Sequence, residues 1–123
     1  MINGTEIWPS LDGWKNKILF IETSEEKPTP QNVKYILRTL QAQGIINVIN
    51  GIIVGKPRGE IYYKDYKEVL KTVIGIEAHR PDLPIIYNAN FGHSEPIGIL
   101  PYGVNCEIDC DNKKITLLES AVL

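Results

Sequence analysis

Three short apolar runs alternate with two segments of helical periodicity along this chain of 123 residues. The runs cover residues 17–22, 50–55 and 84–88, and the first is partly β-branched and lacks polar–apolar alternation. An apolar run without alternation is typical of a strand that is covered on both faces. Because helical crossovers join consecutive runs, the pattern predicts parallel strands with helices packed on the sheet. We expect residues 17–22 to form a central strand.

The two segments between these runs carry the signals of helices. Thr29 can cap the first helix, Pro30 suits its first turn, and Gly44 can end it. The apolar residues that recur at helical spacing are Val33, Ile36, Leu37 and Leu40 in the first segment, and Tyr66, Val69, Leu70, Val73 and Ile74 in the second. The pattern therefore predicts one helix of about three turns before Gly44 and another within residues 62–79.

The C-terminal part of the chain has a different pattern. Residues 105–110 and 114–119 alternate polar and apolar side chains around a central turn, which predicts an antiparallel hairpin. Residues 3–8 could add an edge strand. The predicted fold class is therefore α/β, with a mixed sheet, about two main helices and a C-terminal β-hairpin, in a single domain that spans residues 1–123.

Charge and hydropathy argue against two classes of partner. The net charge of −2 is spread along the chain without a basic patch, so we expect no nucleic-acid partner. The apolar runs are far shorter than the roughly 20 residues that span a bilayer, and residues 1–6 do not resemble a secretory signal, so we expect no membrane partner.

The two cysteines predict no disulfide and no metal site. Cys106 and Cys110 would lie on one face of a strand, about 13 Å apart at about 3.3 Å per residue. A disulfide needs Cα atoms within about 7 Å, and the chain has no CxxC or HxxxH spacing for zinc. Reduced thiols agree with a cytoplasmic location.

One ionisable residue lies at the end of each of two predicted strands. Glu22 ends the first apolar run, and His93 follows the third. In open α/β sheets, ligands bind outside the carboxyl ends of the strands. If the two strands lie side by side or one apart, their tips are about 5 to 10 Å from each other. Glu22 could accept a hydrogen bond from one ring nitrogen of His93, which leaves the other nitrogen free to act as a general base.

Each of these residues also has a purely structural interpretation. His93 could be a loop imidazole that bonds to the backbone, and Glu22 could pair with Lys17, Lys27 or solvent. Ser94 adjoins the histidine, but on extended backbone it would point away, and it lacks a GxSxG elbow. The chain therefore offers an acid and a base without a nucleophile.

Four stretches of the sequence resemble a known family. Residues 18–26, 51–57, 91–96 and 100–103 closely resemble the C-terminal domain of serine LD-carboxypeptidases, in the family's order and over nearly the whole chain. The resemblance is closest to the branch that includes the microcin C self-immunity protein. It implies a swivelling β/α domain.

The resemblance also implies an activity. Family enzymes are Ser-His-Glu hydrolases, and Glu22 and His93 match the acid and the base. The serine and the oxyanion-hole amides belong to a preceding N-terminal domain that is missing from this sequence, so the chain alone is expected to be inactive. Family enzymes cleave an L–D amide bond in murein tetrapeptides, and the immunity branch hydrolyses a peptidyl-nucleotide antibiotic. The resemblance implies no metal and no organic cofactor, and it suggests a homodimer.

A polar loop after the second predicted strand could contact a substrate. Lys56 and Arg58 could bind a substrate carboxylate or phosphate and Glu60 an amino group, although a solvated loop would look the same.

Two functions other than hydrolysis are also compatible with the sequence. The chain could be a mobile carrier domain with a phosphorylated His93. It could also be a non-catalytic ligand-binding module in which Glu22 and His93 are structural.

Overall fold

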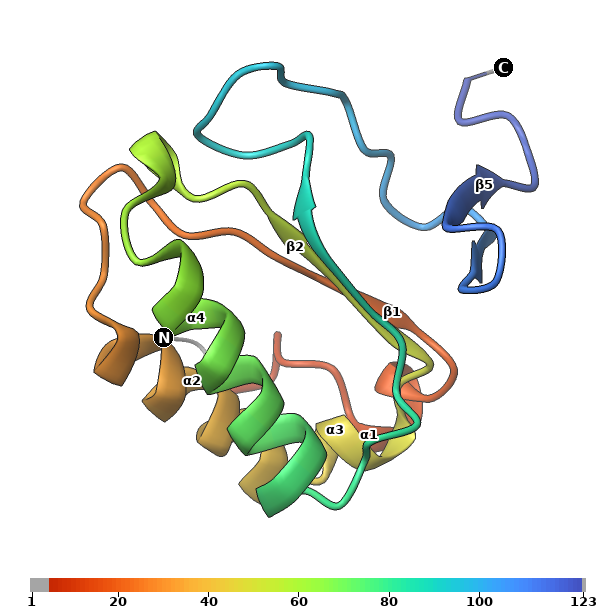
Figure 1. Cartoon of the computed structure of the whole chain (residues 1–123). Coiled ribbons are helices and arrows are strands. Elements are labelled where there is room, and N and C mark those ends of the chain that lie inside the picture. Colours follow the sequence, from red (N-terminus) through yellow and green to blue (C-terminus); the bar gives the residue numbers. More distant parts are fainter. Residues whose placement is uncertain (1–4, 123) are drawn as a thin grey trace.

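A parallel three-stranded sheet forms the centre of the protein. The computed structural model describes residues 5–122, and its sheet contains β1 (Ile18–Ile21), β2 (Gly51–Gly55) and β3 (Ile85–Ala89) (Figure 1). The strand order is β1-β2-β3, and both strand pairs are parallel. The three predicted strands and their relative direction are therefore confirmed.

The central strand is β2, so the expectation that residues 17–22 form a central strand is wrong. All five residues of β2 are buried, whereas the four residues of β1 are half-buried. Each new strand is added on the same side as the chain proceeds, which leaves β1 at an edge. The sequence did not show which of the two strands is central, because both are continuous apolar runs.

Two long helices cover one face of the sheet (Figure 1). Helix α2 (Pro30–Ala42) begins after Thr29, whose side chain accepts a hydrogen bond from a backbone N–H in the first turn, and ends before Gly44 at φ 77°. The second helix runs as α4 (Tyr63–Leu70) and continues as the π-helical segment η2 (Lys71–Glu77). Both predicted helices are confirmed, and the π segment is a local widening that apolar spacing does not reveal.

Three short helical segments lie at the connections. They are α1 (Leu11–Trp14), α3 (Ile45–Val48) and η1 (Arg58–Glu60). Residues 5–8 form a turn, with the N–H of Trp8 bonded to the carbonyl of Thr5, rather than part of the expected edge strand. Residues 3 and 4 of that expected strand lie outside the described residues. Within residues 5–122, no helix has the length and apolar content needed to cross a bilayer.

The main core lies between the helices and the sheet. Its buried residues are Val33, Leu37, Leu40, Ile45, Ile46, Ile49, Ile52, Val54, Tyr66, Leu70, Val73, Ile74 and Leu83. Polar contacts fix the helices in place. Arg38 of α2 donates two hydrogen bonds to Glu77, and the hydroxyl of Tyr87 in β3 donates to the carbonyl of Tyr63 at 2.7 Å. Burial raises the pKa of Tyr87 to about 12, so this hydroxyl stays protonated and structural.

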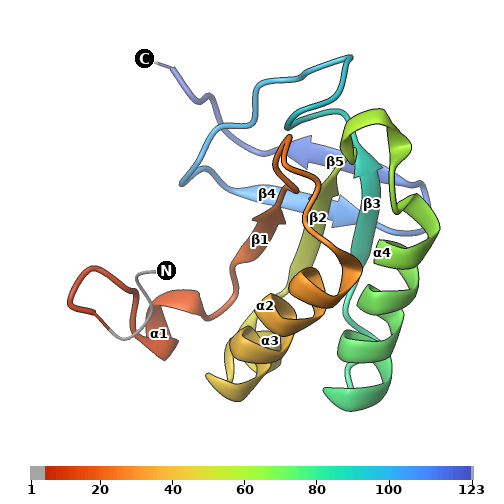
Figure 2. The same cartoon turned by 90° about the vertical axis from the view of Figure 1, so that its left-hand side faces the viewer.

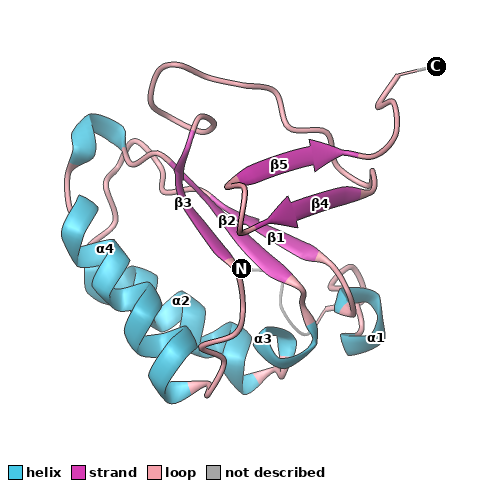
Figure 3. Ribbon diagram, turned by 45° about the vertical axis from the view of Figure 1, so that its right-hand side comes forward, coloured by secondary structure: helices cyan, strands magenta, loops and turns pink. Residues whose placement is uncertain are grey.

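The predicted C-terminal hairpin is present, but it does not extend the main sheet. Strands β4 (Cys106–Asp109) and β5 (Lys114–Leu117) are antiparallel and form a separate two-stranded sheet. Figure 2 and Figure 3 show the hairpin running across the face of the main sheet that the helices leave uncovered. A Cβ at Gly51 would lie 2.8 Å from Cδ1 of Ile108, so this glycine lets the hairpin approach the sheet. The expected single mixed sheet is therefore two stacked sheets.

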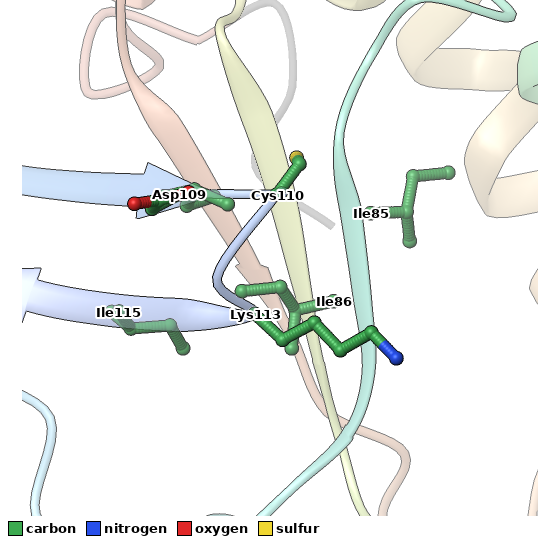
Figure 4. Close-up of a pocket in the computed structure, with 7 residues that line it drawn as sticks. Ile85, Ile86, Asp109, Cys110, Lys113 and Ile115 are labelled. Atoms are coloured by element: carbon green, nitrogen blue, oxygen red, sulfur yellow. The ribbon is translucent and has the colours of Figure 1, made fainter.

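A pocket of about 490 Å³ remains between β3 and the hairpin (Figure 4). Its wall is mostly apolar and is formed by Ile85, Ile86, Ile108, Asp109, Cys110, Lys113 and Ile115. Both cysteines are free thiols, with Cys106 half-buried and Cys110 exposed. The pocket is lined by Ile85 and Ile86 at the start of β3 and by residues of the hairpin, whereas the loop that carries His93 follows the other end of β3.

The second helix offers a matched test of this core. Ile74 is 1% exposed and Ile76 is 68% exposed, and both lie in η2. We expect Ile74→Ala to lower the free energy of unfolding by about 2–5 kcal/mol, because it leaves a cavity. Ile76→Ala should change it by no more than about 0.5 kcal/mol. Urea unfolding followed by circular dichroism measures both, and equal effects would contradict the assignment of the buried face.

Candidate active site

The structure brings Glu22 and His93 together at the carboxyl end of the parallel sheet. Nδ1 of His93 lies 3.9 Å from Oε2 of Glu22, which is within ion-pair range but longer than a hydrogen bond. Glu22 directly follows β1, and His93 lies in the loop after β3. Figure 2 shows the loops that follow the three parallel strands gathered at the same end of the sheet. Because β2 separates β1 from β3, the loop after β3 that carries His93, here called the histidine loop, must cross the end of β2 to reach Glu22.

A bulge at the end of β3 starts this crossing. Val54 pairs with Tyr87 and Gly55 with Ala89, so Asn88 is an extra residue in β3. Asn88 has φ 69°, a left-handed conformation that asparagine tolerates better than most residues. The bulge bends the chain at the point where it leaves the sheet, and this bend directs the histidine loop.

Packing and one backbone bond hold the histidine loop in place. Phe91 is buried and lies over the end of β2, where a Cβ at Gly55 would be 2.9 Å from the Phe91 carbonyl oxygen. The Phe91 ring also contacts the ring of Phe20 in β1, with centroids 6.0 Å apart. The N–H of Gly98 donates to the carbonyl of Asn90 at 2.6 Å and closes the loop. The loop that carries His93 is therefore anchored at both ends.

Gly92 creates the space that Glu22 occupies beside the histidine. Its φ is 91°, a conformation that side chains rarely adopt. A Cβ at this position would lie 2.9 Å from Oε2 and 3.3 Å from Cβ of Glu22. Any side chain at position 92 would therefore push the carboxylate away from the imidazole.

A second carboxylate approaches His93, and the sequence analysis missed it. Oε2 of Glu25 lies 3.5 Å from Nε2 of His93, the ring nitrogen that does not face Glu22. The same oxygen lies 3.8 Å from Nη1 of Arg58. A turn after β1 reverses the chain, with the N–H of Lys27 bonded to the carbonyl of Ser24, and this turn returns Glu25 to the site. The polar run that ends at a proline was the available signal for such a turn.

Two of the three loop residues proposed to bind substrate reach the same cluster. Nζ of Lys56 donates to the carbonyl of Glu95 at 3.2 Å, and Arg58 faces Glu25. Glu60 is exposed and makes no ion pair within the described part of the chain. The hydroxyl of Ser94 donates to the carbonyl of Pro57 at 3.1 Å, so Ser94 ties the two loops together.

Glu22 and His93 lie on an open surface. The side chain of His93 is 34% exposed and that of Glu22 is 51% exposed. Neither residue lines the pocket under the hairpin or the pocket between β1 and residues 101–105. A shallow depression nearby is formed by Glu95, Pro96 and Ile97. Among residues 5–122, no three histidine, cysteine or acidic side chains are grouped so that they could hold a metal ion.

The chain belongs to the family of the LD-carboxypeptidase C-terminal domain, whose family model matches residues 1–108. A protein of Treponema pallidum (strain Nichols) named "Putative carboxypeptidase" is 30% identical over 126 residues, which cover 99% of this chain and 35% of that protein. The family that the sequence motifs indicated is therefore confirmed.

Two solved structures share this fold. An MccF-like protein from Streptococcus pneumoniae, crystallised in complex with AMP, is 44% identical with a TM-score of 0.81, over 90% of this chain and 31% of that chain. The microcin C7 self immunity protein MccF is 28% identical with a TM-score of 0.73, over 99% and 35% respectively. The chain thus spans about a third of the length of the relatives it matches, and the predicted α/β class is confirmed.

Substitution of Gly92 tests what brings the acid and the base together. We expect Gly92→Ala to move the Glu22 carboxylate away from His93, because the new Cβ would take its place. Gly103→Ala is the matched control, since Gly103 also has a positive φ (77°) but a Cβ there would meet nothing within 4 Å. NMR contacts between the His93 ring and the Glu22 side chain should disappear only in Gly92→Ala. Their survival in that variant would contradict the steric explanation.

Proposed function

We propose that this chain is the acid–base domain of a serine hydrolase of the LD-carboxypeptidase family. In this proposal His93 is the general base, Glu22 orients it, and a separate N-terminal domain supplies the serine and the oxyanion-hole amides. The observation that carries the proposal is the approach of Glu22 to His93 at the carboxyl edge of the sheet, in a chain of this family. A carboxylate on one nitrogen of an imidazole is the arrangement that a triad base requires.

The chemistry assigns a separate task to each ring nitrogen. In the complete site, Glu22 moves closer to His93 and accepts its Nδ1–H, which fixes the tautomer and stabilises the imidazolium. Nε2 then takes the proton of the serine hydroxyl as its oxygen attacks the substrate carbonyl carbon. The imidazolium returns this proton to the leaving group as the scissile bond breaks and an acyl-enzyme forms. Water repeats the sequence, releases the acid product and restores the serine.

Three features support a partner domain that carries the nucleophile. The acid and the base are open to solvent, and Ser94 uses its hydroxyl to hold the loop rather than facing a substrate. Apolar side chains stand exposed within and just beyond the histidine loop: Ile97, Ile99 at 95%, and Tyr102. The matched relatives are about three times as long as this chain. An open apolar surface beside an incomplete site suits a covering domain.

The substrate is proposed to be a murein tetrapeptide or a peptidyl nucleotide. Lys56 and Arg58 lie in the loop next to the histidine and could bind a carboxylate or a phosphate. The relative from Streptococcus pneumoniae was crystallised with AMP, and MccF with aspartyl sulfamoyl adenosine, which favours a nucleotide-bearing substrate for this chain. A cytoplasmic location and a homodimer remain part of the same proposal.

The carrier-domain alternative is less compatible with the charges around the ring. A phosphorylated histidine needs space and positive charge around the modified nitrogen. Here Nδ1 faces Glu22 and Nε2 faces Glu25, so either phosphoryl position would meet a carboxylate. Hydrolysis by a base with an acidic orienter makes better use of this surface.

Activity measurements on the protein that joins this chain to its nucleophile domain test the proposal. We expect His93→Ala and Glu22→Gln each to reduce kcat by about 10²- to 10⁴-fold, because proton transfer loses its base or its orienter. His79→Ala is the control, since His79 is the other of the two histidines and its side chain is exposed. Murein tetrapeptide and a peptidyl nucleotide should be assayed in parallel to identify the substrate. Near-normal turnover in His93→Ala would contradict the proposed base.

A further inference from the structure

His93 lies between two carboxylates, and each one faces a different ring nitrogen. Glu22 lies 3.9 Å from Nδ1 and Glu25 lies 3.5 Å from Nε2. The proposed mechanism uses the first contact but has no role for the second. The second contact occupies the nitrogen that a serine hydroxyl would have to reach.

The two carboxylates favour different tautomers of the neutral imidazole. A neutral histidine carries one ring proton, and an ionised carboxylate can only accept a hydrogen bond. Glu22 therefore favours the proton on Nδ1, which leaves a lone pair on Nε2 and makes the ring a competent base. Glu25 favours the proton on Nε2, which removes that lone pair. Glu25 is the nearer of the two, at 3.5 Å against 3.9 Å, so it has the shorter distance to close to form a hydrogen bond with the ring.

Arg58 offers Glu25 another partner. Its Nη1 lies 3.8 Å from the same oxygen that faces the histidine, and both side chains are more than half exposed. A change of side-chain rotamer can therefore turn Glu25 fully towards the guanidinium without moving the backbone. Arginine binds carboxylates in a two-pronged geometry that is stronger than the present single long contact.

We propose that Glu25 is a positioning residue that selects the tautomer of His93, holding the proton on Nε2 until Glu25 turns to Arg58. The proposal rests on the function proposed above, because only a general base needs the lone pair on Nε2. When the nucleophile domain docks, the serine hydroxyl replaces Glu25 at Nε2, and the ring proton passes to Nδ1 beside Glu22. The isolated domain therefore keeps its base inactive, and completion of the site activates it.

NMR of the ¹⁵N-labelled chain tests the tautomer directly, at a pH where His93 is neutral. The two ring nitrogen shifts distinguish a protonated from an unprotonated nitrogen. In the unmodified chain we expect the proton mainly on Nε2. In Glu25→Ala it should move mainly to Nδ1, so the two nitrogens exchange their shifts. Glu26→Ala, a neighbouring exposed glutamate with no ion pair in the described chain, is the matched control and should leave the shifts unchanged.

Two further results complete the test. Glu22→Ala should leave the proton on Nε2, because it removes only the competing carboxylate. A proton mainly on Nδ1 in the unmodified chain, or a Glu25→Ala spectrum identical to it, would overturn the proposal. This readout needs no catalysis, so it is separate from the activity test: if His93→Ala keeps normal turnover, the proposed function fails even where the tautomer responds to Glu25.

Discussion

The close approach of Phe91 to the end of β2 is the contact on which the site depends. β2 lies between β1 and β3, so a residue after β3 can meet a residue after β1 only if its loop crosses the end of β2. Gly55 has no Cβ, and this permits the Phe91 carbonyl to lie where a side chain would otherwise be. The buried phenylalanine anchors the crossing. The glycine next to it then leaves room for the carboxylate of Glu22.

The fold separates the packed core of the domain from the loops that carry the candidate site. Helices α2 and α4 pack their apolar faces on the sheet and supply the core, while the hairpin lies across the opposite face (Figure 3). The charged residues of the site lie in the segments that follow the three parallel strands, with Arg58 in the short helix η1. These segments gather at one end of the sheet (Figure 2). This separation is common in α/β proteins, because the sequence of a loop can change without disrupting the packed core. Here the loops hold an acid and a base on an open surface, which suits a partner that completes the site.

Much of this arrangement follows from local patterns. The helix before Gly44 could be predicted because a cap, a proline and an apolar face agree on the same limits. The apolar runs predicted the three parallel strands, their ends indicated Glu22 and His93, and the family motifs then matched these two residues. The place of β2 at the centre could not be predicted, since two continuous apolar runs look alike in the sequence. The hairpin was predicted, but not its position across the sheet, which depends on Ile108 meeting Gly51.

The sequence alone determined the two long helices, the three parallel strands and the hairpin, the family to which the chain belongs, and the acid and base that are candidates for catalysis. These properties are local, because they depend on periodicity, caps and short motifs. Only the tertiary structure decided that Glu25 and Arg58 join His93, and that the imidazole is contacted on both nitrogens. Such distances depend on how three loops pack against one another. No pattern along the chain encodes that packing in isolation, because it arises from contacts between residues far apart in sequence.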